Sequence, residues 1–184
     1  IGAIATYVKS GDSWIQLGDL LHSTNTSTDV NTYFGDSVSL TADGNTLIVG
    51  ATGWIVDDVS NAGKVFIYDR DGDSWVERGA GISLPTLYSS MGSSCEISSN
   101  GNIVVVGAYR KTDDCGTILI YDREGDNWIL REEIFDHVNA NRSGFGEAIT
   151  INHDASLIVS GDDCIDFSDT ITDVGCAYFY KNPV

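Results

Sequence analysis

Cations and proline are scarce in this sequence. Its 184 residues include 10 Lys and Arg against 27 Asp and Glu, which gives a formal charge of -17, and only 2 Pro. Because nucleic-acid-binding proteins neutralise phosphates with Lys and Arg, this balance predicts no nucleic-acid partner. It also disfavours an anionic membrane surface, and it is compatible with cationic partners, divalent ions or solubility alone.

Long apolar runs are also missing. No stretch approaches the roughly 20 apolar residues of a transmembrane helix, so we expect no membrane insertion. Hydrophobic residues nevertheless make up 42% of the chain, and 20 Gly accompany the 2 Pro. That composition excludes a disordered or collagen-like chain and suits a domain with a core of its own.

Catalytic signatures are a third absence. The sequence contains no Gly-x-Ser-x-Gly elbow, no His-Glu-x-x-His pair, no phosphate-binding glycine loop and no Cys-x-x-Cys. Carboxylates are plentiful, but no pair stands out in an environment that would make one of them a proton donor. We therefore expect a protein that is not an enzyme.

An aromatic block recurs along the chain. A Tyr and a Trp flank a Gly-Asp pair in each of the segments 7–14, 68–75 and 121–128. A Gly precedes each Tyr by five positions, and Gly175 and Tyr180 repeat that offset once more. The period of 53 to 61 residues is typical of a repeat protein. Aromatic residues at recurring positions indicate packing between repeats rather than a platform for sugars.

A glycine-rich block recurs between the aromatic blocks. Each copy begins with a Gly that follows Phe or Met. It ends with a pair of small residues, which stands at the end of the next apolar run. The copies are Phe34-Gly35 with Gly50-Ala51, Met91-Gly92 with Gly107-Ala108, and Phe145-Gly146 with Ser160-Gly161. We expect neighbouring backbones to crowd the first glycine of each copy near the axis of a ring, so that a Cβ there would clash.

Each repeat predicts four short antiparallel strands. The first alternates apolar and polar residues, the second is a continuous apolar run, the third carries the Tyr and the fourth begins at the Trp. Asp-Gly and Asn-Gly turns follow the first strands. The predicted strands are 36–41, 46–50, 64–69 and 75–79 in one repeat and 93–98, 102–107, 117–122 and 128–132 in the next.

Radial stacking would bury both apolar faces of such sheets. The expected fold is therefore all-β, with four-stranded antiparallel sheets as β-propeller blades, and a β-sandwich is the competing arrangement. The single repeat domain 1–184 divides into a partial blade at 1–21, blades at 34–82 and 91–134, and a partial blade at 145–181. Since propellers have four to eight blades, we expect an arc or fragment of a larger propeller, from a processed or longer chain.

The motifs resemble FG-GAP repeats. Phe-Gly followed by Gly-Ala, a Gly-x-x-x-x-Tyr strand and a Gly-Asp-x-Trp hairpin are similar to the repeats in the propeller heads of integrin alpha subunits and of microbial and algal surface proteins. The resemblance covers nearly the whole chain and implies a propeller. Blades of that family often carry an Asp-x-Asp-x-Asp-Gly calcium loop, but the segments 41–45, 98–102 and 152–156 lack its three spaced carboxylates.

Acidic pairs between the second and third strands form the candidate site. These pairs are Asp57 and Asp58, Asp113 and Asp114, and Asp162 and Asp163. Lined up on one rim, their carboxylates would hold calcium or dock a basic partner, and the alternative is a solvated acidic loop. Apart from calcium, we expect no cofactor.

The four cysteines lead to different expectations. Cys95 aligns with apolar strand residues and should be a buried, reduced thiol. Cys164 and Cys176 flank the loop between the second and third strands of the last repeat, and we expect a disulfide between them, while Cys115 stays undecided. Together with sequons at Asn25 and Asn141, this favours an extracellular or organelle-lumen location.

The sequence thus predicts a non-catalytic structural or protein-interaction module. In this interpretation a propeller scaffold presents acidic loops to a protein partner, as part of a larger complex or a longer chain. Two alternatives stay open. One is an extracellular, calcium-dependent adhesion or glycan-binding module, and the other is a fragment of a propeller hydrolase.

Overall fold

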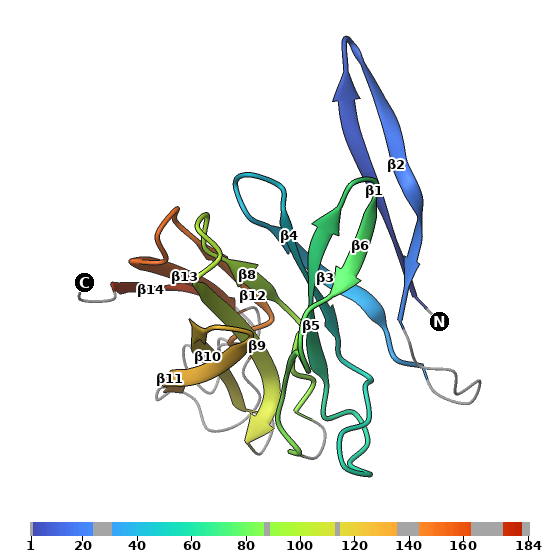
Figure 1. Cartoon of the computed structure of the whole chain (residues 1–184). Helices are drawn as coiled ribbons and strands as arrows, with labels where there is room; N and C mark the ends of the chain where they lie inside the picture. Colours follow the sequence, from blue (N-terminus) through green and yellow to red (C-terminus); the bar gives the residue numbers. More distant parts are fainter. Residues whose placement is uncertain are drawn as a thin grey trace.

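The computed structural model is built of antiparallel β-strands (Figure 1). It describes residues 2–23, 31–86, 89–112, 115–135, 144–162 and 175–181. No helix occurs in these ranges, so the expected all-β class is confirmed. Within the same ranges, no helical segment combines the length and the hydropathy needed to cross a membrane.

The strands follow one another as antiparallel meanders in four separate sheets. The first sheet is a hairpin of β1 (Ala3–Ser10) and β2 (Ser13–His22). The second contains β3 (Phe34–Leu40), β4 (Thr46–Ala51), β5 (Lys64–Asp71), β6 (Ser74–Glu77) and the short β7 (Ile82–Ser83), which pairs with β5. The third contains β8 (Cys95–Ile97), β9 (Ile103–Thr112), β10 (Cys115–Glu124) and β11 (Asn127–Phe135), and the fourth β12 (Ala148–Ile151), β13 (Leu157–Asp162) and β14 (Cys176–Lys181).

All eight strands predicted for the two complete repeats are present. In the second and third sheets each predicted strand pairs with its predicted neighbour, in the order first, second, third, fourth. The strands from β9 to β11 run several residues longer than the sequence pattern suggested. None of the four sheets closes on itself within the described residues, and their arrangement as propeller blades stays a prediction.

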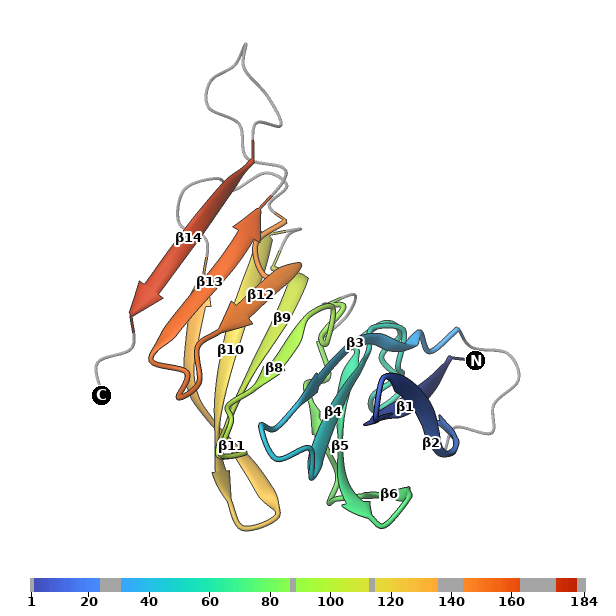
Figure 2. The same ribbon diagram turned by 90° about the horizontal axis from the view of Figure 1, so that it is seen from above.

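The sheets stack face to face in chain order, with the N-terminal hairpin and β14 at opposite ends of the row (Figure 2). The first strands β3, β8 and β12 lie beside one another. Between successive sheets lie three apolar clusters, which together form the core. In β4, Leu47 and Val49 belong to the cluster facing the first sheet, whereas Ile48 belongs to the cluster facing the third. A continuous apolar run is thus required because both faces of the strand are covered.

Close backbone contact between successive sheets explains the recurring glycines. A Cβ on Gly50 would lie 2.0 Å from the carbonyl oxygen of Gly92, and one on Gly107 would lie 1.8 Å from that of Gly146. The glycine that opens the third strand has the same constraint, since a Cβ on Gly116 would lie 1.6 Å from the carbonyl oxygen of Phe145. Each of these contacts joins one repeat to the next, so the motif encodes sheet stacking.

The expected crowding by a neighbouring backbone is confirmed at Gly92 and Gly146, whereas at Gly35 the nearest atom belongs to a side chain, and the position near a ring axis stays a prediction. All three have left-handed backbones, with φ of +99°, +88° and +86°. A Cβ would lie 3.0 Å from Ile4 Cδ1 at Gly35, 3.1 Å from Lys64 O at Gly92 and 2.6 Å from Thr117 O at Gly146. The crowding atoms belong to the third strand of the preceding sheet. A side chain at these positions would therefore be both strained and obstructed.

The alignment of the last repeat needs a correction of one residue. Gly161 pairs with Ala148 and Ala177, as Gly107 pairs with Ile118 in the third sheet. Gly161 and Asp162 therefore occupy the places of Gly107 and Ala108, not Ser160 and Gly161 as the sequence suggested. The shift was concealed because Ser160 and Gly161 are both small, like the Gly-Ala pairs of the earlier repeats.

The recurring aromatic residues were predicted to pack between repeats. The Trp residues do so where another sheet precedes their own sheet. Trp75 and Trp128 contact the clusters in front of the second and third sheets. Trp14 has no preceding sheet and is 68% exposed. The apolar face of β3 is likewise half open at Val38, because the first sheet has only two strands to cover it.

The cysteines follow the expectations in part. Cys95 is 2% exposed with a free thiol, so its predicted burial is confirmed. Cys176 is an exposed, free thiol, which does not agree with the expected bridge, and its expected partner Cys164 lies outside the described residues. The sequons at Asn25 and Asn141 also lie outside them.

Candidate functional site

Asp57 and Asp58 form the tip of a tight hairpin in the connection between β4 and β5. Val56 and Val59 exchange backbone hydrogen bonds across the turn, at 3.2 and 2.8 Å. Both aspartates have left-handed backbones, with φ of +49° and +64°. A two-residue turn with two positive φ angles favours Asn, Asp and Gly at its centre. The acidic pair is thus explained by backbone geometry, and its carboxylates are left to face solvent.

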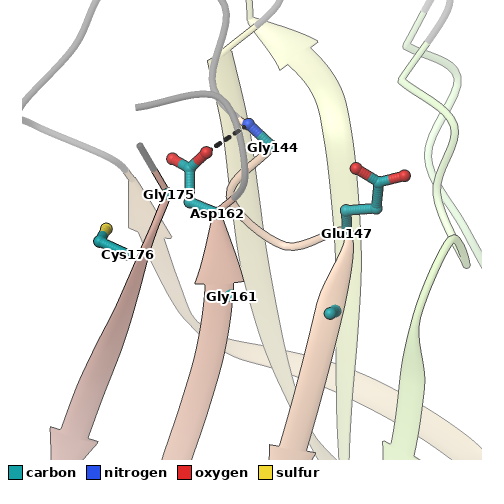
Figure 3. A pocket seen from close by; sticks show the side chains of 7 residues that line it. Gly144, Glu147, Gly161, Asp162, Gly175 and Cys176 are labelled. Atoms are coloured by element: carbon teal, nitrogen blue, oxygen red, sulfur yellow. Dashed lines mark hydrogen bonds between the residues drawn. The ribbon is translucent and has the colours of Figure 1, made fainter. Parts of the chain in front are cut away.

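Asp162 has a different role. It is 3% exposed and pairs with Cys176 in the ladder between β13 and β14. Its Oδ1 accepts a hydrogen bond from the backbone N–H of Gly144 at 2.9 Å (Figure 3). Since it stands where the earlier repeats have Ala51 and Ala108, this carboxylate secures the start of the last repeat.

Only part of the predicted acidic rim lies within the described residues. Asp113, Asp114 and Asp163 lie outside the described residues. Among the residues that are described, no three His, Cys, Asp or Glu side chains are arranged to hold a metal ion. The predicted calcium rim therefore stays a prediction.

In the turns between first and second strands, side-chain oxygens accept hydrogen bonds from groups of the same turn. Asp43 Oδ1 accepts hydrogen bonds from the Thr41 hydroxyl at 2.6 Å and the Asn45 backbone N–H at 3.0 Å. Asn100 and Asp154 accept the backbone N–H two residues ahead in the same way. In these turns, which are the segments 41–45, 98–102 and 152–156, the side-chain oxygens accept hydrogen bonds from the turn itself.

A polar cavity of about 410 Å³ lies between the second and third sheets, at the end of the strands that carries the Asp57 turn. Its lining combines a carboxylate, a guanidinium, hydroxyls and an amide. These side chains come from Tyr33, Asp36, Thr52, Asn61, Ser90, Tyr109 and Arg110. The Thr52 hydroxyl donates to the Asp36 carboxylate, and the Arg110 guanidinium lies 5.0 Å from the centre of the Tyr109 ring.

Left-handed backbone is concentrated around this cavity. Tyr33, Asn61 and Ser90 have φ of +52°, +51° and +50°. Such angles are uncommon for residues other than glycine, and strained backbone often accompanies binding sites. Sequence reasoning missed this cavity, because its residues come from three separate connections and from the strands β3 and β9. Only Tyr33 and Ser90 share a signal, since each precedes the Phe or Met of the glycine-rich block.

A second cavity of about 380 Å³ lies at the same end of the fourth sheet. Glu147, Gly161, Asp162 and Cys176 lie around it, with Asp162 turned toward Gly144 (Figure 3). Its surface is mostly apolar, and its buried carboxylate is already hydrogen-bonded to the backbone. The polar groups that line the two cavities can take part in binding through hydrogen bonds.

Comparison with known proteins gives only remote similarity. No protein-family model and no curated protein matches the sequence. Among solved structures, the crystal structure of TolB from Acinetobacter baumannii is similar with a TM-score of 0.47 and 10% sequence identity. The match covers 98% of this chain but 40% of the TolB chain. A similarity at this level is too weak to assign a function.

Proposed function

We propose that this chain is a non-catalytic scaffold of β-propeller blades that presents acidic loops to a protein partner. The observation that supports the proposal most directly is the use of the repeated residues. The recurring Gly, Trp and apolar positions contact the neighbouring sheets, so the residues that define the repeat serve stacking. The surface left for recognition is made of the connections between strands.

The FG-GAP resemblance and the sheet topology support the propeller part of the proposal. Two successive repeats form four-stranded antiparallel meanders, with their first strands side by side. Stacked meanders of this kind are the architecture of propeller blades. The formal charge of -17 supports a basic partner, since an acidic surface attracts cations over a distance set by the ionic strength.

The Asp57–Asp58 turn offers a clean test of acidic docking. Because Asn also suits a turn with two positive φ angles, the double variant Asp57→Asn/Asp58→Asn removes two charges and keeps the hairpin. We expect a fluorescently labelled Lys/Arg-rich peptide to bind the natural chain with an affinity that falls as salt rises. The double variant should bind about 2- to 30-fold more weakly, the range expected for two exposed charge pairs of about 0.2–1 kcal/mol each.

A matched control separates a docking surface from general charge. Asp71→Asn/Asp73→Asn removes two charges from the β5–β6 hairpin, at the opposite end of the strands. We expect this control to keep most of the affinity of the natural chain. Equal losses in both double variants, or no binding at low salt, would contradict the proposal that the connections beside Asp57 and Asp58 dock the partner.

A further inference from the structure

The polar cavity between the second and third sheets is bounded by complete repeats. Each of these two sheets has the four strands of a full repeat. Backbone hydrogen bonds join the connections around the cavity. The Gly53 N–H donates to the Thr32 carbonyl at 3.1 Å, and the Ser90 N–H donates to the Asn61 carbonyl at 3.2 Å. The walls are thus fixed before a ligand enters, which reduces the entropy cost of binding.

Arg110 of β9 supplies a positive charge to the cavity. Its guanidinium lies 5.0 Å from the centre of the Tyr109 ring, and both residues line the cavity. The other arginines with described side chains each donate to a protein oxygen; they are Arg70, Arg78, Arg123 and Arg131. In the part of the chain that the structure describes, the Arg110 guanidinium donates to no protein oxygen. Its planar fork of N–H groups can therefore bind a carboxylate through two hydrogen bonds.

Asp36 of β3 supplies a negative charge from the second sheet. Its side chain is exposed, and its Oδ2 accepts a hydrogen bond from the Thr52 hydroxyl. Within the described residues no ion pair joins Asp36 to Arg110, although both line the same cavity. Two opposite charges that share a cavity without contacting each other suit a ligand that carries both charges.

Strained backbone holds three further side chains at the cavity. Tyr33, Asn61 and Ser90 all line it, and all have left-handed φ angles. Tyr33 and Ser90 occupy the same place in successive repeats, and the third repeat has Gly144 there. Glycine adopts such a backbone without strain, so a Tyr and a Ser at this place lower the stability of the fold. Strain of this kind is typical of residues that contact a ligand.

We propose that this cavity binds a free α-amino acid. The carboxylate of the amino acid accepts hydrogen bonds from the Arg110 guanidinium, and its ammonium group donates to the Asp36 carboxylate. The amide of Asn61 and the hydroxyls of Ser90 and Tyr33 remain for the side chain of the ligand.

Size and charge both favour this class of ligand. The cavity of about 410 Å³ is at the small end of ligand pockets, which span about 300–1,000 Å³, and so it suits a single amino acid. An α-amino acid with a neutral side chain carries no net charge, whereas a simple carboxylate is an anion. A chain with a formal charge of -17 repels an anion and admits a zwitterion.

This binding site goes beyond the proposed function and can be tested apart from it. Asp57 and Asp58 do not belong to the described lining of the cavity. The variant Asp57→Asn/Asp58→Asn should therefore bind an amino acid like the natural chain, whether or not it binds the basic peptide more weakly.

Thermal unfolding of the full chain with each of the twenty common L-amino acids identifies the ligand. We expect at least one of them, at about 10 mM, to raise the unfolding temperature, because a ligand that binds only the folded state stabilises it. Isothermal titration calorimetry then compares this amino acid with its amide, which lacks the carboxylate, and with the corresponding acid that lacks the amino group. Each analogue should bind at least about 10-fold more weakly, since each loses a charged hydrogen-bonding group.

Two variants assign these contacts. Arg110→Gln should weaken binding of the amino acid by about 10-fold or more and remove the preference for it over its amide. Asp36→Asn keeps an acceptor for the Thr52 hydroxyl, and it should remove the preference over the acid that lacks the amino group. Circular dichroism verifies folding. Arg110→Lys, which keeps the charge but loses the fork, gives a second measurement at the same position.

Arg70→Gln and Asp71→Asn are the matched controls. They remove the same two charges from the β5–β6 hairpin, at the opposite end of the strands, and should bind the amino acid like the natural chain. Three results would each overturn the proposal: no amino acid raises the unfolding temperature, an analogue binds as tightly as the amino acid, or the folded Arg110 and Asp36 variants bind like the controls.

Discussion

At the residue scale, small polar side chains hold the tight turns of this protein. Asp43 accepts three hydrogen bonds within its own turn, from the Thr41 hydroxyl and from the backbone and side chain of Asn45. Asp154 accepts the hydroxyl and backbone N–H of Ser156. Hydrogen bonds to a carboxylate favour its charged form, so the pKa values of these two carboxylates should be measurably lowered.

The hydrogen bond from Thr41, followed by those from Asn45, lowers the pKa of Asp43 below its ordinary 3.8. Because the folded pKa is below the unfolded one, the contribution to stability is present above the unfolded pKa and is lost as the pH falls through the folded value. We expect the carboxyl-carbon resonance of Asp43, followed by NMR, to titrate with a midpoint below 3.8.

Thr41→Val should move the midpoint of Asp43 toward 3.8, because it removes the largest cause of the lowered pKa. Thr41→Ser keeps the hydroxyl and should retain the lowered value. Asp154 should be unaffected by either change, since the Ser156 hydroxyl is the largest cause of its lowered pKa. A midpoint at or above 3.8 in the natural chain would mean that the turn does not hold its carboxylate as described.

At the element scale, the sequence of each sheet reflects its contacts with the neighbouring sheets as well as the pairing of its own strands. Gly50, Gly107 and Gly161 occupy the same place in three second strands, since each pairs with the residue two positions after the glycine that opens the third strand. The first two abut the backbone of the following sheet, whereas the nearest atom to a Cβ on Gly161 is the Ala148 Cβ, at 3.7 Å. The chain thus contains its own comparison between a covered and an uncovered position.

Gly107→Ala should destabilise the protein by about 3 kcal/mol or more, because the new methyl group cannot fit 1.8 Å from the Gly146 carbonyl oxygen unless the sheets move apart. Gly161→Ala should change the free energy of unfolding by less than about 0.5 kcal/mol, as at an ordinary surface position. Urea denaturation followed by circular dichroism measures both. Similar losses in the two variants would show that the glycines serve strand formation and not stacking.

At the scale of the whole molecule, the structural features that recur in each repeat were predicted from the sequence, whereas the features that occur only once were missed. Strand order and the glycine contacts follow from periodicity, because the same physical constraint recurs in each repeat. The exposure of Trp14 and Phe179 could not be read from one residue, since the equivalent positions are buried elsewhere. The polar cavity was missed because Asp36, Asn61 and Arg110 come together only after the sheets stack.

Stacking also explains why one cysteine is protected. Cys95 belongs to the cluster between the second and third sheets, and its sulfur accepts a hydrogen bond from the Ser37 hydroxyl of the second sheet at 3.0 Å. Burial raises the pKa of the Cys95 thiol to about 12. The reactive thiolate is therefore scarce at neutral pH and has no access to solvent while the two sheets remain together.

The labelling of Cys95 should report the separation of these sheets. We expect iodoacetamide to modify the exposed Cys176 readily in the native protein and to leave Cys95 unmodified, with peptide mass spectrometry to distinguish the two sites. Gly50→Ala, which places a methyl group 2.0 Å from the Gly92 carbonyl oxygen, should speed the modification of Cys95 more than Gly107→Ala does. The reason is that Gly50 lies in the same gap as Cys95, whereas Gly107 lies in the next gap. Modification of Cys95 as fast as Cys176 in the native chain would contradict a closed stack.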